Sequence, residues 1–252
     1  STARAISAAV QGQPATVVDE AKPSTQSSPL LYDLTTLQRE ANGRFGFSAK
    51  TTLSIAQTLY EKHKVLTYPR TDSRNLPEDY LATVKETVTM LSTEDLPGPL
   101  RALNAHARKA LKEGYIKPMK RVFDNAKVSD HFAIIPTLQA PSGLSEAEQK
   151  LYDLVVRRFI AVFFPSAEFM VTTRISKVLN HHFKTEFQTN GKVLVNAGWL
   201  AVYGKEAQDS SGDGANLVAV APGEQVRTES VDVKALKTKP PARYTEATLL
   251  SA

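Results

Sequence analysis

Hydrophobic positions recur every three to four residues through the middle of the chain, which is the period of an amphipathic helix. Ser48 is placed to cap one such helix, whose apolar face would hold Leu53, Ala56, Leu59 and Tyr60. The segment Ser145-Glu-Ala-Glu148 has the form of a capping box and stands ahead of a second apolar face. These patterns predict a mainly helical region over residues 31–167.

Strand-like alternation lies on both sides of this helical region. Residues 14–21 alternate before it, and the Ser/Pro-rich stretch 22–29 predicts a linker. After Pro165 the alternation predicts further strands, at 169–178, 182–189, 192–197, 199–203, 217–220 and 225–236. Thr189-Asn-Gly-Lys192 predicts a hairpin turn. We therefore expect an α+β fold in which a β-rich domain is interrupted by a mainly helical insertion.

Composition narrows the function classes. The 252 residues include no cysteine, which excludes disulfide scaffolds, zinc ribbons and thiol catalysis. No apolar run is long enough to span a membrane, and no signal peptide opens the sequence. The chain begins with Ser, and we expect it to be cut from a longer protein.

The net charge of +5 is unevenly distributed. Between Arg101 and Lys127 there are eight Lys and Arg residues but only two acids, Glu113 and Asp124. This stretch predicts either a phosphate-facing patch or a solvated helical face, and both interpretations stay open.

An unusual segment, Leu66-Thr-Tyr-Pro-Arg-Thr-Asp-Ser73, contains a tyrosine followed by proline. Pro69 biases Tyr68 toward an extended backbone, in which side chains two residues apart point to the same side. Tyr68 and Arg70 are therefore placed to meet one phosphate, the phenol as a nucleophile in phosphodiester exchange and the guanidinium as a bidentate partner. A structural tyrosine in a turn beside a surface arginine is the alternative.

Two further segments carry candidate phosphate contacts. His131 precedes an apolar run that ends at Pro136, and its imidazole can contact phosphate or move a proton. Arg243 lies just ahead of a helix that Thr245 is expected to open, and helix N-termini favour anions. Ordinary structural roles at a strand entry and a helix start remain the alternatives.

Taken in order, these segments resemble the type IA DNA topoisomerases, and among them the topoisomerase III branch. The resemblance rests on five segments: Leu34–Lys50, Gln57–Glu61, Leu66–Ser73, Asp130–Thr137 and Pro240–Ala247. It spans about Tyr32 to Leu250 in the order of that family. One departure is Phe132, where many topoisomerase III sequences have a second histidine.

The resemblance implies a role for each candidate residue. Tyr68 would attack a single DNA strand and form a 5′-phosphotyrosine, with Arg70 and His131 at the phosphate. Asp72, two positions from Arg70, is expected to lie near it and help to orient it. Arg243 and Thr245 would contact DNA. Strand passage and religation would follow without ATP, and no phosphate-binding P-loop occurs in the sequence.

The resemblance also implies Mg²⁺, held by an acidic N-terminal domain. No Asp-x-Asp occurs in the sequence, so we expect this chain to bind no metal and to be nearly inactive alone. Residues 1–30 and 168–238 would be two parts of a β-rich arch domain. Residues 31–167 would be the helical domain that carries Tyr68, and 239–252 the start of the last core segment.

Expected partners are single-stranded DNA and the remaining domains of the same polypeptide, for a monomer in the cytoplasm at the bacterial nucleoid. A non-catalytic module that binds single-stranded DNA through the basic stretch, Tyr115 and Phe123 is the main alternative. A rolling-circle relaxase is disfavoured, because its His-hydrophobic-His metal site is not present and His181 and His182 are adjacent.

Overall fold

The computed structural model describes residues 2–251 apart from 94–95, 97, 180–183 and 212–216, so His181 and His182 lie outside the described residues. The fold is mixed α+β, as the sequence predicts, with a four-stranded antiparallel sheet. Contacts divide the chain into two compact units. One is β-rich and comprises Ser1–Gln26, Ala167–Ala197 and Lys205–Pro241; the other is mainly helical and comprises Ser27–Ser166, Gly198–Gly204 and Ala242–Ala252.

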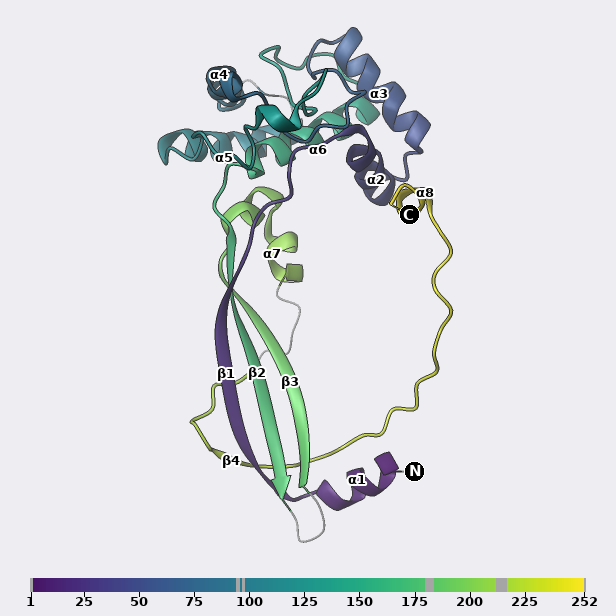
Figure 1. Ribbon diagram of the computed structural model, residues 1–252, viewed down its shortest axis with the longest axis vertical. Coiled ribbons are helices and arrows are strands. Elements are labelled where there is room, and N and C mark those ends of the chain that lie inside the picture. Colours follow the sequence, from purple (N-terminus) through teal and green to yellow (C-terminus); the bar gives the residue numbers. More distant parts are fainter. Residues whose placement is uncertain (1, 94–95, 97, 180–183, 212–216, 252) are drawn as a thin grey trace. The chain divides into compact units, whose positions relative to one another are not determined.

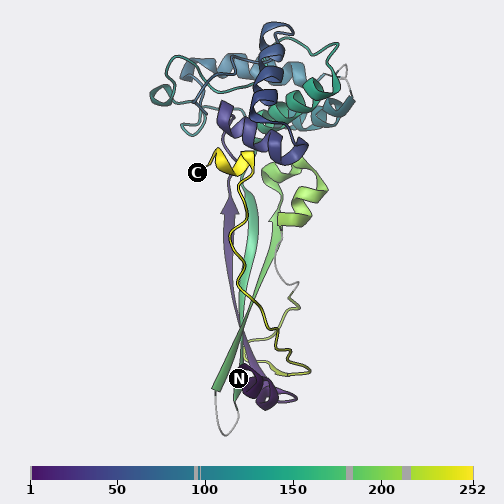
Figure 2. The same ribbon diagram turned by 90° about the vertical axis from the view of Figure 1, so that its right-hand side faces the viewer.

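The β-rich unit is built on a sheet with the strand order β3-β2-β1-β4 (Figures 1 and 2). Its elements are α1 (Thr2–Val10), β1 (Pro14–Gln26), β2 (Ala167–Leu179), β3 (Lys184–Asn196), α7 (Lys205–Ser211) and β4 (Gln225–Arg227). β1 pairs with β2 from Ala15 opposite Val178 to Gln26 opposite Ala167. The first strand therefore shares a sheet with strands that follow residues 27–166 of the helical unit in sequence.

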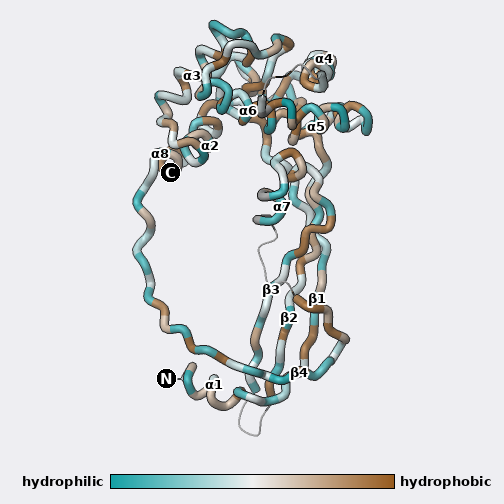
Figure 3. Tube along the Cα trace, turned by 180° about the vertical axis from the view of Figure 1, so that it is seen from behind, coloured by the Kyte–Doolittle hydropathy of each residue, from teal (hydrophilic) through white to brown (hydrophobic). Residues whose placement is uncertain are grey.

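The apolar core of the β-rich unit is small. Val10, Ala15 and Val178 are buried, and Ile6, Phe187 and Val231 pack against them. Apolar and polar residues are interleaved along the strands (Figure 3). An ion pair also stabilises the sheet. Arg174 Nε and Nη2 donate to Asp19 Oδ1 and Oδ2 at 2.7 and 2.8 Å. This bidentate pair joins β1 to β2 directly.

Two local predictions for this unit are wrong. The predicted linker 22–29 is strand as far as Gln26, since Lys22 to Gln26 pair with Val171 to Ala167. β4 pairs with β1 only at residues 14–16, so Pro23 removes no hydrogen bond on that side. The predicted hairpin at Thr189–Lys192 lies inside β3, where these residues pair with Arg174–Val171 of β2.

Three predicted strands differ from the structure. Gly198–Tyr203 forms a 3₁₀ helix rather than a strand, after a turn in which Gly198 has a φ of +50°. The strand predicted over 225–236 ends at Arg227, because only Pro14–Thr16 of β1 offer it a partner. Residues 217–220 are likewise not a strand. In each case the alternation is present, but apart from residues 225–227 it belongs to no strand of the described sheet.

The helical unit is organised around α6 (Glu146–Ala161), which Ser145 opens with the predicted capping box. Its other helices are α2 (Leu34–Phe45), α3 (Ala49–Glu61), α4 (Leu81–Leu91), α5 (Arg101–Lys112) and α8 (Glu246–Leu249). Ser48 caps α3, as predicted, and Asp33 caps α2. Residues on all sides of α6 are buried, among them Tyr152, Val156 and Phe159, as expected for a central helix.

A buried arginine ties α6 to the rest of this unit. Arg158 is 7% exposed and pairs with Glu40 of α2, while its Nη1 donates to the Leu30 carbonyl at 3.0 Å. Tyr32 and Tyr203 complete the cluster: Tyr32 Oη donates to Glu40 at 2.6 Å, and Arg158 Nε donates to Tyr203 Oη at 3.2 Å. A buried charge is tolerated only when it is satisfied in this way.

Candidate active site

The segment that carries Tyr68 is held in place by backbone hydrogen bonds to a distant segment. Leu66 pairs antiparallel with Pro136, and Thr67 N donates to the Ile135 carbonyl at 3.0 Å. Further along, Thr71 Oγ1 donates to the His131 carbonyl at 3.3 Å. These contacts place the two motifs side by side, although about 60 positions or more separate their bonded residues.

Tyr68 and His131 are in direct ring contact. Their ring centroids are 4.2 Å apart, with an angle of 40° between the ring planes. Tyr68 is half-buried and His131 is exposed, so both groups are open to a ligand from solvent. On its other side the Tyr68 ring makes an edge contact with Tyr60 of α3, at 5.4 Å between centroids. The phenol is thus fixed between a helix and an imidazole.

Arg70 lies against the same face of α3. With the amide of Gln57 oriented to satisfy both of its polar atoms, Gln57 Oε1 accepts from Arg70 Nη2 at 3.3 Å and from Nε at 3.2 Å. Gln57 and Tyr60 are three residues apart on α3 and are neighbours on its surface. Arg70 and Tyr68 therefore meet adjacent positions of one helix. No local sequence pattern had pointed to this contact of Gln57.

The arrangement around Asp72 differs from the expected one. Asp72 is exposed, and no ion pair or hydrogen bond joins it to Arg70 in the part of the chain that the structure describes. Gln57 occupies the position beside the guanidinium instead. The structure thus brings Tyr68, Arg70 and His131 together and leaves Asp72 outside the contact.

Burial distinguishes four tyrosines of the chain from an accessible nucleophile. Burial raises the pKa of four phenols, and their hydroxyls are correspondingly poor nucleophiles: Tyr32, Tyr80, Tyr152 and Tyr203. Tyr68 is the tyrosine for which the described residues show a histidine ring contact. That contact distinguishes it from Tyr60, Tyr115 and Tyr244.

Thr245 begins α8, as predicted: its hydroxyl accepts from Thr248 N at 3.2 Å. Glu246 accepts from Ala49 N at 2.8 Å, which fixes α8 to the start of α3. Arg243 is exposed. Because α8 is a single turn and Thr245 satisfies the Thr248 amide, the expected anion site at this helix start has little support from the structure.

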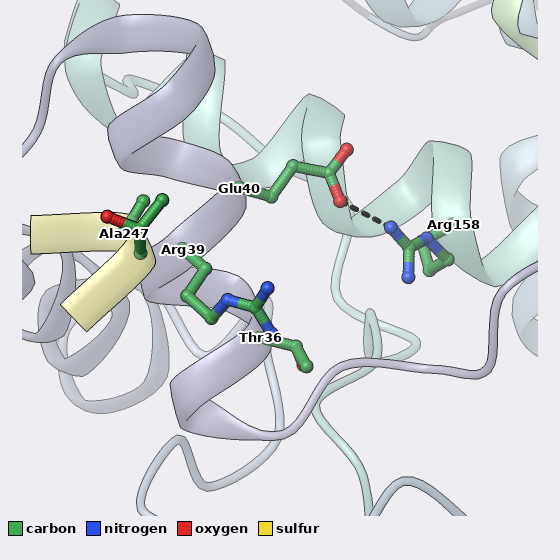
Figure 4. A pocket seen from close by; sticks show the side chains of 6 residues that line it. Thr36, Arg39, Glu40, Arg158 and Ala247 are labelled. Carbon is green, nitrogen blue, oxygen red and sulfur yellow. Dashed lines mark hydrogen bonds and ion pairs between the residues drawn. The ribbon is translucent and has the colours of Figure 1, made fainter. Parts of the chain in front are cut away.

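A hollow of about 320 Å³ lies where α8 meets α2 and α6. Figure 4 shows Glu40 and Arg158 joined by their ion pair in its wall, with Thr36 and Arg39 on α2 and Ala247 on α8. The charges of Glu40 and Arg158 neutralise each other in this ion pair. Arg39 is exposed at the rim.

Metal-ligating side chains do not cluster in the described ranges. No group of three or more His, Cys, Asp or Glu side chains there could hold a metal ion. The residues of the Tyr68 site therefore do not fit an Mg²⁺ ion by themselves. Within the same ranges, no helix has both the length and the apolar character needed to cross a membrane.

Comparisons with known proteins agree on one family. A family model described as DNA topoisomerase matches residues 1–252. The chain is 43% identical over 252 residues to DNA topoisomerase 3 of Bacillus licheniformis, covering 98% of this chain and 33% of that protein. It is 41% identical over 249 residues to DNA topoisomerase 3 of Bacillus subtilis, covering 96% of this chain and 33% of that protein.

A solved structure shares the fold. Full-length topoisomerase I from Thermotoga maritima superposes with a TM-score of 0.68 at 22% identity, over 99% of this chain and 39% of that one. The chain thus spans about a third of the length of the curated relatives that it matches.

Proposed function

Because the chain belongs to the type IA DNA topoisomerases, in their topoisomerase III branch, we propose that it carries the tyrosine with which such an enzyme cuts one DNA strand. The observation that carries this proposal is the contact of Tyr68 with His131, 4.2 Å between ring centroids, beside Arg70. A nucleophile, a proton-transferring group and a phosphate-binding cation are the parts that a phosphodiester exchange requires.

In the proposed reaction, Tyr68 Oη attacks the phosphorus of a single-strand phosphodiester. The bond from phosphorus to the 3′-oxygen breaks, and a 5′-phosphotyrosine forms. The phenolic proton must leave and the departing 3′-oxygen must gain one, and the imidazole of His131 lies close enough to Tyr68 to move a proton there. Religation is the same exchange in reverse, so no ATP is consumed.

Arg70 is assigned to the phosphate. Its guanidinium is exposed, and Gln57 is its partner in the described part of the chain, so its charge is not cancelled by an acid. A planar guanidinium held at one edge can present its remaining N–H groups to two phosphate oxygens. Gln57 then acts as the residue that orients Arg70.

The domain assignment is part of the same proposal. Residues 1–30 and 168–238 would form the β-rich arch domain, 31–167 the domain that carries Tyr68, and 239–252 the start of the last core segment. The pairing of β1 with β2 supports a β domain made from two separated segments. Mg²⁺, single-stranded DNA as substrate, and a place at the bacterial nucleoid are proposals for the longer protein.

A chimaera tests the proposal. This chain replaces the matching third of the Bacillus subtilis relative, and the product is assayed for relaxation of supercoiled DNA and for covalent adduct. Tyr68→Phe is expected to reduce both to background. Tyr60→Phe is the matched control, because it removes a neighbouring hydroxyl and keeps the ring, and it should retain both. Equal loss in the two variants would contradict the assignment.

A further inference from the structure

A second hollow lies within the helical unit, beside the end of α5, and its volume is about 420 Å³. That is within the range of about 300–1,000 Å³ common for small-ligand sites. Its wall combines aromatic rings, cations, a hydroxyl and one acid: Tyr115, Phe163, Phe164, Lys117, Arg121, Ser28 and Glu113. None of these residues belongs to the Tyr68 site.

The end of α5 places the first ring of this hollow. Gly114 has a φ of +64°, and Tyr115 N donates back to the Ala110 carbonyl at 3.0 Å, which is the pattern of a Schellman turn. The turn brings the half-buried Tyr115 ring against Phe164, at 5.2 Å between centroids. Phe123, which the sequence suggested as a second stacking residue, is only 3% exposed and is part of the core.

The cations of the hollow share its wall with one acid, Glu113, but no ion pair joins Glu113 to them in the part of the chain that the structure describes. Arg121 donates to Ser28 Oγ at 3.2 Å and to the Ser28 carbonyl. Burial and the neighbouring charge of Arg74 lower the pKa of Arg121, and Arg74 itself donates to the Leu31 carbonyl at 3.2 Å. In the described part of the chain, no ion pair joins either guanidinium to an acid, and the partners of both are neutral oxygens. An anion entering here would relieve this repulsion.

Lys117 adds a third positive charge to this region. It is exposed, two positions from Tyr115 and four from Arg121. Two residues of extended chain span at most ~7 Å, so ring and ammonium lie within reach of one small ligand. A bare anion would leave the rings unused, and an apolar ligand would leave the cations unpaired. A ligand with both a planar ring and a phosphate uses all of them.

We propose that this hollow binds one nucleotide of a single DNA strand, with the base against Tyr115 and the phosphate against Lys117 and Arg121. The inference rests on the proposed function, because it supplies the strand that Tyr68 attacks with an anchoring point outside the reacting site. Stacking on an aromatic ring tolerates any base, so the subsite holds the strand without reading its sequence.

Photocrosslinking tests the inference. The 252-residue chain is irradiated with a 12-mer that carries 5-iododeoxyuridine, and crosslinked residues are mapped by mass spectrometry. A crosslink at Tyr115 is expected. In fluorescence anisotropy with the same 12-mer, Tyr115→Leu should weaken binding about tenfold, as loss of base stacking does. Lys117→Gln should weaken binding and reduce its salt dependence.

Two control variants separate stacking and local charge from general effects. Tyr115→Phe keeps the ring, and Lys85→Gln removes an equal charge from an exposed position on α4; both should bind within about twofold of the unchanged chain. Circular dichroism confirms that each variant is folded. Crosslinks confined to residues near Tyr68, unchanged binding of Tyr115→Leu, or no binding of the 12-mer would each overturn the inference. The chimaera assay of Tyr68 is independent of all three results.

Discussion

At the residue scale, the fold gives Tyr68 surroundings that its sequence neighbours alone would not. Tyr60 contacts one side of its ring and His131 another, while Pro69 directly after it is buried. The phenol is therefore restricted in position and still half open to solvent. A restricted, accessible nucleophile loses less conformational freedom when it reacts.

His131 is expected to contribute to the chemistry and not only to packing. His131→Gln in the chimaera should lower the rate of covalent adduct formation by ~100-fold or more, the usual size of a general acid–base contribution. Quenched time courses with labelled single-stranded DNA measure that rate.

Phe132, next to His131 in sequence, is the control position. Its ring packs against Tyr80, at 4.8 Å between centroids. Phe132→His should leave the adduct rate within a few-fold. A His131→Gln rate equal to that of the unchanged chimaera would show that His131 is only a packing partner.

At the scale of elements, the first residue of the 3₁₀ helix Gly198–Tyr203 has to be glycine. Gly198 has a φ of +50°, and a Cβ there would lie 2.4 Å from the Ser166 carbonyl oxygen and 2.5 Å from that of Pro165. Both of these oxygens are backbone atoms and cannot move cheaply. We expect Gly198→Ala to lower the free energy of unfolding by ~3 kcal/mol or more, measured by urea titration.

Gly43 is the control position for the Gly198→Ala substitution. It lies inside α2 without a positive φ, and a Cβ added there would meet no other atom within 4 Å. Gly43→Ala should stabilise the chain by ~1 kcal/mol, the difference in helix propensity. Similar effects of the two substitutions would mean that the turn at Gly198 is not constrained as the structure shows.

Elements that depend on a few neighbouring residues could be predicted from the sequence. Caps at Ser48, Ser145 and Thr245 each need only a side chain and an amide three residues away. The extension of β1 through Gln26 could not be predicted, because its partner lies in β2. The contact of Gln57 with Arg70 was missed for the same reason: it joins a helix to a separate extended segment.

In the candidate site too, local motifs could be predicted from the sequence but contacts between distant segments could not. The motifs that contain Tyr68 and His131 could be found from sequence, through their resemblance to a family. Their ring contact depends on the antiparallel pairing of Leu66 with Pro136, which no local pattern indicates. Asp72 shows that spacing in the sequence does not suffice: it is two positions from Arg70, yet no hydrogen bond or ion pair joins the two in the described part of the chain.

At the scale of the whole molecule, the chain should bind single-stranded DNA mainly through phosphate contacts. If Arg70, Lys117 and Arg121 each neutralise one phosphate, the logarithm of the binding constant falls with a slope of about −2 against the logarithm of salt concentration. Between about 50 and 200 mM salt, affinity should then fall by ~20-fold. Anisotropy titrations at several salt concentrations measure this slope, and a slope near zero would contradict binding through these cations.

The central claim is that Tyr68 is the group that becomes bonded to DNA. The direct measurement uses an oligonucleotide whose 5′-phosphate is a p-nitrophenyl ester. Tyr68 Oη would attack phosphorus, the bond to the p-nitrophenyl oxygen would break, and p-nitrophenolate would leave without needing a proton. The test therefore needs only the groups that this chain supplies.

We expect a burst of p-nitrophenolate and an adduct that mass spectrometry maps to Tyr68. Both should be lost in Tyr68→Phe and retained in Tyr60→Phe. An adduct on Tyr115 or Tyr244, or one that survives Tyr68→Phe, would contradict the claim.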